Sequence, residues 1–476
     1  MPRRSVRGGG KVCPTDDHAP RSFVPDVMST PLCTPSPTQT DGSTFIGWYQ
    51  RNRERSRQLF AMVSEQAYYS QPIALRHPIV FYEGHLPAFS FNTLVKGALG
   101  GPSIDARLEA LFARGIDPSE DAAVTGAVFE WPSRDAVRQF ADEADRRVLE
   151  MLRTEELNRP GHPLLDRAEA VFTLLEHEAM HQETLLYIWH RLPFADKQRP
   201  AGYQPKVGGD APPRAWVSVP PGHAALGVDR ERVEFGWDNE CPAHAVSVGA
   251  FAIERHDVTN AAFFDFVDAG GYRDARWWRR SDWAWLQKEG VEHPLFWERG
   301  DAEWYWRGMF DRVPLPASWP VYVTHAEASA YARWTGSRLP SEAEFQRAAY
   351  GTDDGTERVH PWGAAPAEER HGVFDFASWD PMPSGSHPDG RSAWGIDDLV
   401  GNGWEWTSSV FEPFPGFRPM ASYPQYSHDF FDGQHFVMKG ASTATARELL
   451  RPSFRNWFRP RYPYVYATLR CAKDVS

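Results

Sequence analysis

Two histidines four residues apart carry the clearest chemical information in this chain. His177 and His181 lie in the stretch 174–192, where Leu185 and Ile188 share their steps of three and four residues. Residues with this spacing lie on one helix face, the face that a bundle helix turns toward its core. Two imidazoles one turn apart can ligate a single metal ion, although such pairs also occur as ordinary hydrogen-bonded core histidines.

The first half of the chain is predicted to be helical. Apolar residues of helical period predict helices over residues 51–70, 77–99, 133–153 and 162–192, with Ser133 as an N-cap residue. Four helices with longer connections are typical of a four-helix bundle, which we place at residues 43–199. Residues 1–42 are rich in Pro, Ser, Thr and Gly and are predicted to be a disordered leader.

The character of the sequence changes after a linker rich in Pro and Gly at residues 200–215. From residue 216 to 476, short alternating runs are separated by Gly, Pro and Asp, and helical patterns are brief, at residues 260–269, 325–335 and 341–350. This pattern predicts an irregular α+β domain. Trp404 and Trp406 are expected in its core.

Composition excludes several classes of function. Of 476 residues, 42% are apolar and 24% charged, and the net charge is −12 without a long basic run, which argues against nucleic-acid binding. No apolar stretch approaches the ~20 residues needed to span a bilayer, and no apolar region follows the basic N-terminus. The four cysteines form no C-x-x-C pair, so we expect a cytoplasmic protein without a zinc–thiolate site, in which any metal is held by histidine.

A series of short motifs runs through the second half. They read WVSVPPGHAALG, FGWDNECPAHAVSVGAFAIERHDVTNAAFFDFVDAGGY, RLPSEAEFQRAAYG, LVGNGWEWTSS and RPSFRNWFRP. Together they resemble the formylglycine-generating-enzyme-like domain, which is related to C-type lectins. The arrangement behind a DinB-like four-helix bundle is similar to the non-haem iron enzymes that make ergothioneine, ovothiol and selenoneine.

This resemblance implies an Fe(II) site held by three histidines of the bundle. Two of them match His177 and His181, and the third matches His85, with His77 as its rival at the start of the same helix. Three facial ligands leave coordination positions open for O2 and substrates. Glu178 flanks the pair, as does Glu183, and both either orient the ligand imidazoles or form a solvated helix flank.

The resemblance also implies hercynine, the trimethylammonium betaine of histidine, as the acceptor substrate. The string FRNW matches the family's acceptor pocket, with Asn456 and Trp457 as contacts and Arg455 of the same string as a further substrate-binding residue. An aromatic face suits a cationic ligand. Tyr423 and Tyr426 match a tyrosine-rich segment near the family's active site, and either phenol could deliver a proton.

The sequence departs from its thiol-using relatives at the expected donor pocket. Met180 replaces a Gln, and Phe458 replaces the Asp that would bind the amino group of γ-glutamylcysteine. An ammonium buried there without a partner would be unfavourable. We therefore expect a selenosugar donor and C–Se bond formation at the imidazole C2 of hercynine. The alternative is an ergothioneine-type sulfoxide synthase that uses a thiol such as γ-glutamylcysteine or cysteine.

Two other classes of protein remain as alternatives. A copper-dependent formylglycine-generating oxidase needs a cysteine pair in its C-terminal part, where only Cys471 is present and Cys241 is distant. A non-catalytic binding protein would keep the fold, but the three histidines argue against it. Metal analysis separates the three classes, because they predict iron, copper or no metal.

Overall fold

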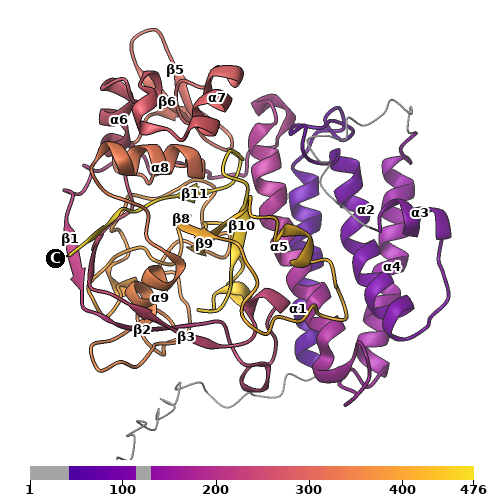
Figure 1. The fold of residues 1–476 in the computed structure, drawn as a ribbon. Helices are drawn as coiled ribbons and strands as arrows, with labels where there is room; N and C mark the ends of the chain where they lie inside the picture. Colours follow the sequence, from indigo (N-terminus) through magenta and orange to yellow (C-terminus); the bar gives the residue numbers. More distant parts are fainter. Residues whose placement is uncertain (1–41, 114–129, 476) are drawn as a thin grey trace, which may run out of the picture. The chain divides into compact units, whose positions relative to one another are not determined.

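The bundle helices of the computed structural model, which describes residues 42–113 and 130–475, run side by side (Figure 1). The predicted bundle is confirmed, with different limits for some helices. Of the predicted leader, residues 1–41 lie outside the described part, and Gly42 already begins the first helix. The bundle elements are α1 (Gly42–Ala61), α2 (Ile79–Ser90), the π-helical continuation η1 (Phe91–Ala98), α3 (Ala106–Leu111), α4 (Arg134–Thr154) and α5 (Glu169–Arg191).

The local sequence accounts for two features of these helices: the start of α4 and the change from α-helix to π-helix at the end of α2. Ser133 caps α4 as predicted, because its hydroxyl accepts a hydrogen bond from the backbone N–H of Ala136 at 3.3 Å. Pro87 lies inside α2 and lacks the amide hydrogen that would close the helical bond to the preceding turn. One turn later the chain widens into the π-helical segment η1. None of the helices in the described ranges is long and apolar enough to cross a membrane.

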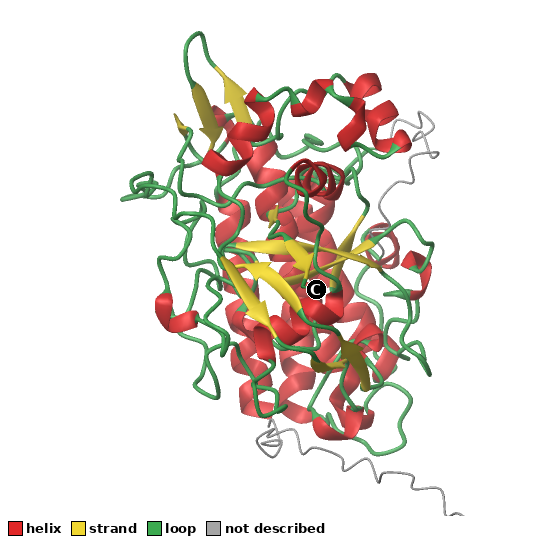
Figure 2. Ribbon diagram, turned by 60° about the vertical axis from the view of Figure 1, so that its left-hand side comes forward, coloured by secondary structure: helices red, strands yellow, loops and turns green. Residues whose placement is uncertain are grey.

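The second domain consists of short strands among long loops, with a few helices (Figure 2). One sheet joins β1 (Trp216–Val219), β4 (Phe251–Glu254) and β12 (Ala472–Asp474), and another joins β10 (Asn456–Phe458), β9 (Phe436–Ala441), β8 (Gly403–Val410) and β11 (Ala467–Thr468) in that order. The smaller sheets are β2 (Gly222–Leu226) with β3 (His244–Val248), and β5 (Trp297–Arg299), β6 (Trp304–Arg307) and β7 (Arg312–Pro314). The helices are α6 (Asn260–Asp268), α7 (Arg280–Glu289), α8 (His325–Trp334) and α9 (Glu342–Tyr350).

Capping and burial support the predicted elements of this domain. Thr324 and Ser341 form capping boxes at the starts of α8 and α9, because each hydroxyl accepts from the N–H of a glutamate three residues later and that glutamate side chain bonds back. Trp404 and Trp406 are buried, as expected for core residues. Helices α3 and α7 were not predicted, since one is only six residues long and the other carries polar residues and tryptophans without clear periodicity.

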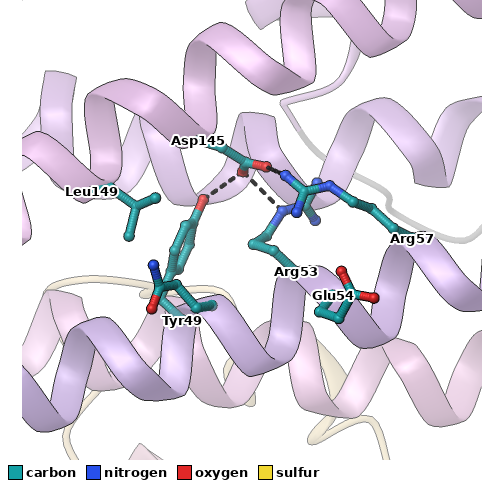
Figure 3. Close-up of a pocket in the computed structure, with 7 residues that line it drawn as sticks. Tyr49, Arg53, Glu54, Arg57, Asp145 and Leu149 are labelled. Carbon is teal, nitrogen blue, oxygen red and sulfur yellow. Dashed lines mark hydrogen bonds and ion pairs between the residues drawn. The ribbon is translucent and has the colours of Figure 1, made fainter.

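A buried ion network joins three bundle helices. Asp145 of α4 accepts from Tyr49, Arg53 and Arg57 of α1 at 2.7–2.8 Å, beside a hollow in the bundle surface (Figure 3). The Arg53 guanidinium also donates to Glu178 of α5 at 2.8 Å. Such a network is satisfied in only one relative placement of the helices, so it fixes where α5 lies against α1 and α4.

Replacement of Gly84 by alanine should destabilise the bundle. A Cβ atom at this position of α2 would lie 2.5 Å from ring carbons of Phe112, whereas one at Gly47 of α1 would make an ordinary contact of 3.6 Å with Arg51. Overpacking of this kind lowers the free energy of unfolding by about 1–3 kcal/mol. We expect that loss for Gly84→Ala and none for Gly47→Ala in urea unfolding; equal stability of both variants would contradict the packing described here.

Candidate metal centre

Three histidine side chains converge inside the bundle. His85 of α2 faces His177 and His181 of α5, with ring centroids 5.2 Å and 5.0 Å apart, and the two α5 rings are separated by 4.4 Å. One nitrogen of each ring lies within 4.8 Å of the others. His77 is not part of this group and stacks instead on Phe81 at 4.2 Å. The structure therefore brings together the three histidines predicted as ligands and leaves the rival outside.

The hydrogen bonding and charge of these rings fit a metal ion. The backbone carbonyl of Phe112 lies 2.8 Å from His85 Nδ1, which leaves Nε2 for a ligand, and Nδ1 of His177 and of His181 have no hydrogen-bond partner among the described residues. Burial lowers the pKa of His85 to about 4 and holds the pKa values of the other two well below the usual value. Three neutral imidazoles suit a transition-metal ion at ~2.1 Å from each nitrogen.

Of the four glutamates of helix α5, the three nearest the histidines, Glu176, Glu178 and Glu183, bind different partners. Glu178 accepts from Arg53 at 2.8 Å and from Ser56 at 2.6 Å, both on α1. Glu183 accepts from Trp404 Nε1 at 2.7 Å in the second domain, and from two hydroxyl groups, those of Ser442 and Thr445. The alternatives considered for Glu178 and Glu183 were wrong, because these carboxylates are neither solvated nor hydrogen-bonded to a histidine in the described residues.

The third carboxylate, Glu176, joins α5 to a buried arginine. Both of its oxygens accept from Arg451 at 2.7 and 2.9 Å, and one accepts from Trp237 Nε1 at 2.8 Å. Arg451 also binds Glu240 of the second domain. Burial raises the pKa of Glu176, so the carboxylate depends on these partners to stay charged.

Of the two predicted catalytic tyrosines, Tyr423 lies beside a histidine and Tyr426 contacts Met180, which lies between His177 and His181 on α5. The ring of Tyr423 is 6.1 Å from that of His177, and the hydroxyl of Tyr426 lies 3.2 Å from the sulfur of Met180. Tyr426 also stacks on Trp237 at 3.9 Å. Burial raises the pKa of Tyr426 well above its usual value, so this phenol stays protonated at neutral pH.

Of the predicted substrate-binding residues, Trp457 and its neighbour Asn456 lie by the tyrosine pair, whereas Arg455 packs inside the second domain. Trp457 stacks on Phe411 at 4.1 Å and meets Tyr426 edge-on at 5.2 Å, which places it next to the tyrosine pair. The side chain of Asn456 accepts from the backbone N–H of Trp457 at 2.9 Å. Arg455 is instead buried and bound to Glu342 by two hydrogen bonds of 2.8 and 3.1 Å, a role in the packing of the second domain.

Sequence reasoning missed three side chains at this site. Arg451 and Trp237 bind Glu176 across 275 and 61 residues of sequence. Arg76 lies over the ring of Phe458, 382 positions further along the chain (458 − 76). No local pattern connects such distant positions, although Trp237 lies within the FGWDNE string.

Comparisons with known proteins match both halves of the chain. The model of the sulfatase-modifying factor enzyme 1-like domain matches residues 204–475, and that of the DinB superfamily matches residues 49–185. Hercynine oxygenase of Mycolicibacterium smegmatis is 39% identical over 314 residues, 63% of this chain and 71% of that protein.

Two further relatives are matched over less of their length. Hercynine oxygenase of Mycobacterium tuberculosis is 42% identical over 253 residues, 52% of this chain and 59% of that protein. Ergothioneine biosynthesis protein 1 of Neurospora crassa is 27% identical over 505 residues, 87% of this chain and 56% of that protein. The chain thus spans less than two thirds of the length of both of these relatives.

Each of the three histidines should be needed for metal binding. Loss of a residue that only orients a metal ligand weakens metal affinity ~10–100-fold. Loss of a ligand itself should therefore weaken metal affinity by more than that. We expect His85→Ala, His177→Ala and His181→Ala to lose metal in equilibrium dialysis, with the helical circular dichroism retained. His77→Ala is the matched control and should bind like the wild type. Full metal content in His177→Ala would show that α5 does not carry the site.

Proposed function

This chain belongs to the family that joins a DinB-superfamily bundle to a sulfatase-modifying factor enzyme 1-like domain and includes hercynine oxygenase, and we propose that it is an Fe(II)- and O2-dependent enzyme acting on hercynine. One observation supports this most directly: three neutral histidines, His85, His177 and His181, lie next to a wall of tyrosine and tryptophan rings. The histidines suit a redox metal with open positions, and the rings suit a quaternary ammonium ion.

The proposed reaction is oxidative C–S bond formation. Hercynine, a thiol and O2 give a hercynine sulfoxide and water: the imidazole C2–H and the S–H bonds break, and a C–S bond and an S–O bond form. The four electrons lost by carbon and sulfur reduce O2, one atom of which enters the sulfoxide and the other water. Iron held by the three histidines would supply the open-shell centre that O2 requires.

The chain's own residues would bind hercynine and handle its protons. Trp457 and Tyr426 offer ring faces to the trimethylammonium group, and Asn456 lies beside them. The imidazole of hercynine then points toward the histidines, past Tyr423. We assign the delivery of a proton to reduced oxygen to one of the two phenols, Tyr423 beside His177 or Tyr426 beside Met180.

We propose a thiol donor rather than a selenium-containing donor because of the names of the relatives. Their names, hercynine oxygenase and ergothioneine biosynthesis protein 1, favour the thiol alternative over the selenosugar that we expected from sequence. A selenosugar remains the second candidate, since Phe458 packs against Tyr462 at 5.1 Å where an acidic residue would hold an amino-acid donor.

Substitution of Trp457 should weaken hercynine binding in particular. A cation–π contact contributes ~0.5–2 kcal/mol, so Trp457→Ala should raise the hercynine KM from a few-fold up to about thirty-fold, with a smaller effect on the donor KM. Trp362→Ala is the matched control, because Trp362 stacks on His371 in a loop of the second domain. An unchanged hercynine KM, with histidine accepted equally well, would refute the assignment of this wall.

Mass spectrometry of products tests the reaction itself. Protein loaded with Fe(II) and supplied with hercynine, O2 and equal amounts of γ-glutamylcysteine and a selenosugar should yield mainly the γ-glutamylcysteine sulfoxide of hercynine. A predominance of the C–Se product by ~10-fold in kcat/KM, about 1.4 kcal/mol, would instead establish the second candidate. No hercynine-derived product with either donor would overturn the proposed function.

A further inference from the structure

Tyr423 and Tyr426 lie in the long connection between two strands of the second domain. Residues 411–435 join β8 to β9. Tyr423 and Tyr426 are the first and last residues of a tight turn, because the backbone N–H of Tyr426 donates to the carbonyl oxygen of Tyr423 at 3.0 Å. Pro424 takes the second position of this turn, where its fixed φ is favoured. We name residues 423–426 the tyrosine turn.

The residue before the tyrosine turn is bound to the start of α5. Ser422 donates from its backbone N–H and from its hydroxyl to one carboxylate oxygen of Glu169, at 3.0 Å in both cases. The Ser422 hydroxyl also lies 2.7 Å from that of Thr173. Thr173 precedes His177 by four residues, about one helical turn, so both lie on one side of α5. This contact therefore ties the turn to the helix that carries two of the predicted metal ligands.

The residue after the tyrosine turn is bound to a buried polar pair. Residues 415–419 and 432–434 of the connection are mostly exposed, whereas Ser427 is buried. Its hydroxyl donates to the carboxylate of Asp238, and the side-chain amide of Asn239 donates to that hydroxyl at 2.9 Å. Asp238 and Asn239 are themselves buried. The preceding residue, Trp237, is the one that stacks on Tyr426 at 3.9 Å.

Between these two fixed points the tyrosine turn follows α5. Ser422 contacts Thr173, the ring of Tyr423 is 6.1 Å from that of His177, and the hydroxyl of Tyr426 is 3.2 Å from the sulfur of Met180. Residue numbers thus rise together along the turn and along the helix. From Thr173 to Met180 the helix rises ~10 Å, a length that the four steps from Ser422 to Tyr426 can cover at up to ~3.3 Å each.

We propose that Ser422 and Ser427 are positioning residues that hold the two phenols at the metal centre. Ser422 acts through Glu169 and Thr173 of α5, and Ser427 acts through Asp238 and Asn239. The inference rests on the proposed function, because it takes the phenols to act on substrates at the histidines. Each serine acts through the tyrosine next to it in the chain.

Hydrogen exchange measured by mass spectrometry tests the two fixed points without metal or turnover. Ser427→Ala removes one hydroxyl, and Glu169→Ala removes the carboxylate that accepts from Ser422. Peptides from residues 411–435 should exchange at least ~10-fold faster in each variant, because a hydrogen bond to a charged group contributes that factor or more. Peptides of α1 should keep the wild-type rate. Wild-type exchange of residues 411–435 in both variants would overturn the proposal.

A matched control separates this effect from the general loss of a serine hydroxyl. Ser64 donates to the carboxylate of Asp196 at 3.2 Å, and both residues lie outside the connection. Ser64→Ala should leave the exchange of residues 411–435 unchanged. Acceleration there equal to that in Ser427→Ala would show that the connection responds to any loss of this kind, and would contradict a specific role for Ser427.

Fluorine NMR reports the position of the ring itself. Protein containing 3-fluorotyrosine is loaded with Co(II), the Zn(II)-loaded protein gives the diamagnetic reference, and Tyr423→Phe assigns the resonance. The cobalt-induced shift falls steeply with distance from the ion. We expect a large shift for Tyr423 in the wild type and in Ser64→Ala, and loss of most of it in Ser427→Ala and Glu169→Ala. A wild-type shift in both of these variants would show that the serines do not place the ring.

A conservative variant tests whether the acceptor oxygen of Glu169 is what matters. Glu169→Gln keeps an oxygen that can accept from Ser422, so it should retain the Tyr423 shift that Glu169→Ala loses. Under turnover, kcat should fall ~10–100-fold in Glu169→Ala and far less in Glu169→Gln, since misplacement of a reacting group by about 1 Å can cost ~100-fold. Equal loss in the two variants would contradict the proposal.

The two measurements distinguish failure of this inference from failure of the proposed function. Absence of a cobalt-induced shift at Tyr423 in the wild type would count against the metal centre, and the exchange rates would still decide whether the serines fix the turn. Unchanged exchange and unchanged shifts in the variants, with a normal wild-type shift, would count only against the serines.

Discussion

The placement of α5 depends on three carboxylates that cannot lie in a protein interior without partners. Glu176, Glu178 and Glu183 are all on this helix, and burial raises the pKa of each. Their partners come from different elements, since Arg53 of α1 binds one and residues of the second domain bind the other two. Removal of one partner from such a buried group typically costs about 3–5 kcal/mol, so the carboxylates are satisfied only when α5 contacts α1 and the second domain together.

This constraint explains how one helix serves both domains. His177 and His181 face α2, whereas Glu176, Met180 and Glu183, spaced by four and three residues, face the second domain. The metal site is therefore placed one residue from the side chains that bind the second domain. Aromatic residues of the second domain reach α5 because the helix is held against them: Tyr423 lies 6.1 Å from His177, and Tyr426 contacts Met180. A shift of α5 along its axis would break the ion pairs before it moved the histidines far.

Features that depend on residues close together in the chain could be predicted from the sequence. The spacing of His177 and His181 and the cap at Ser133 depend on neighbours within four residues, and the structure places them as predicted. His85 came from a family resemblance rather than from spacing. The partners of Glu183 lie 221 to 262 residues away, so no pattern near Glu183 distinguishes a buried anchor from a solvated flank. For the same reason the prediction of Arg455 as a substrate-binding residue was wrong: its partner Glu342 lies 113 residues away in the sequence.

X-ray absorption of the Fe(II)-loaded protein, with and without hercynine, tests the central claim most directly. The account predicts an iron shell with three imidazole nitrogens at ~2.1 Å, supplied by the histidines of α2 and α5, and a change in that shell when hercynine is added. A shell dominated by carboxylate oxygen or thiolate sulfur would contradict the account. So would a spectrum that hercynine leaves unchanged.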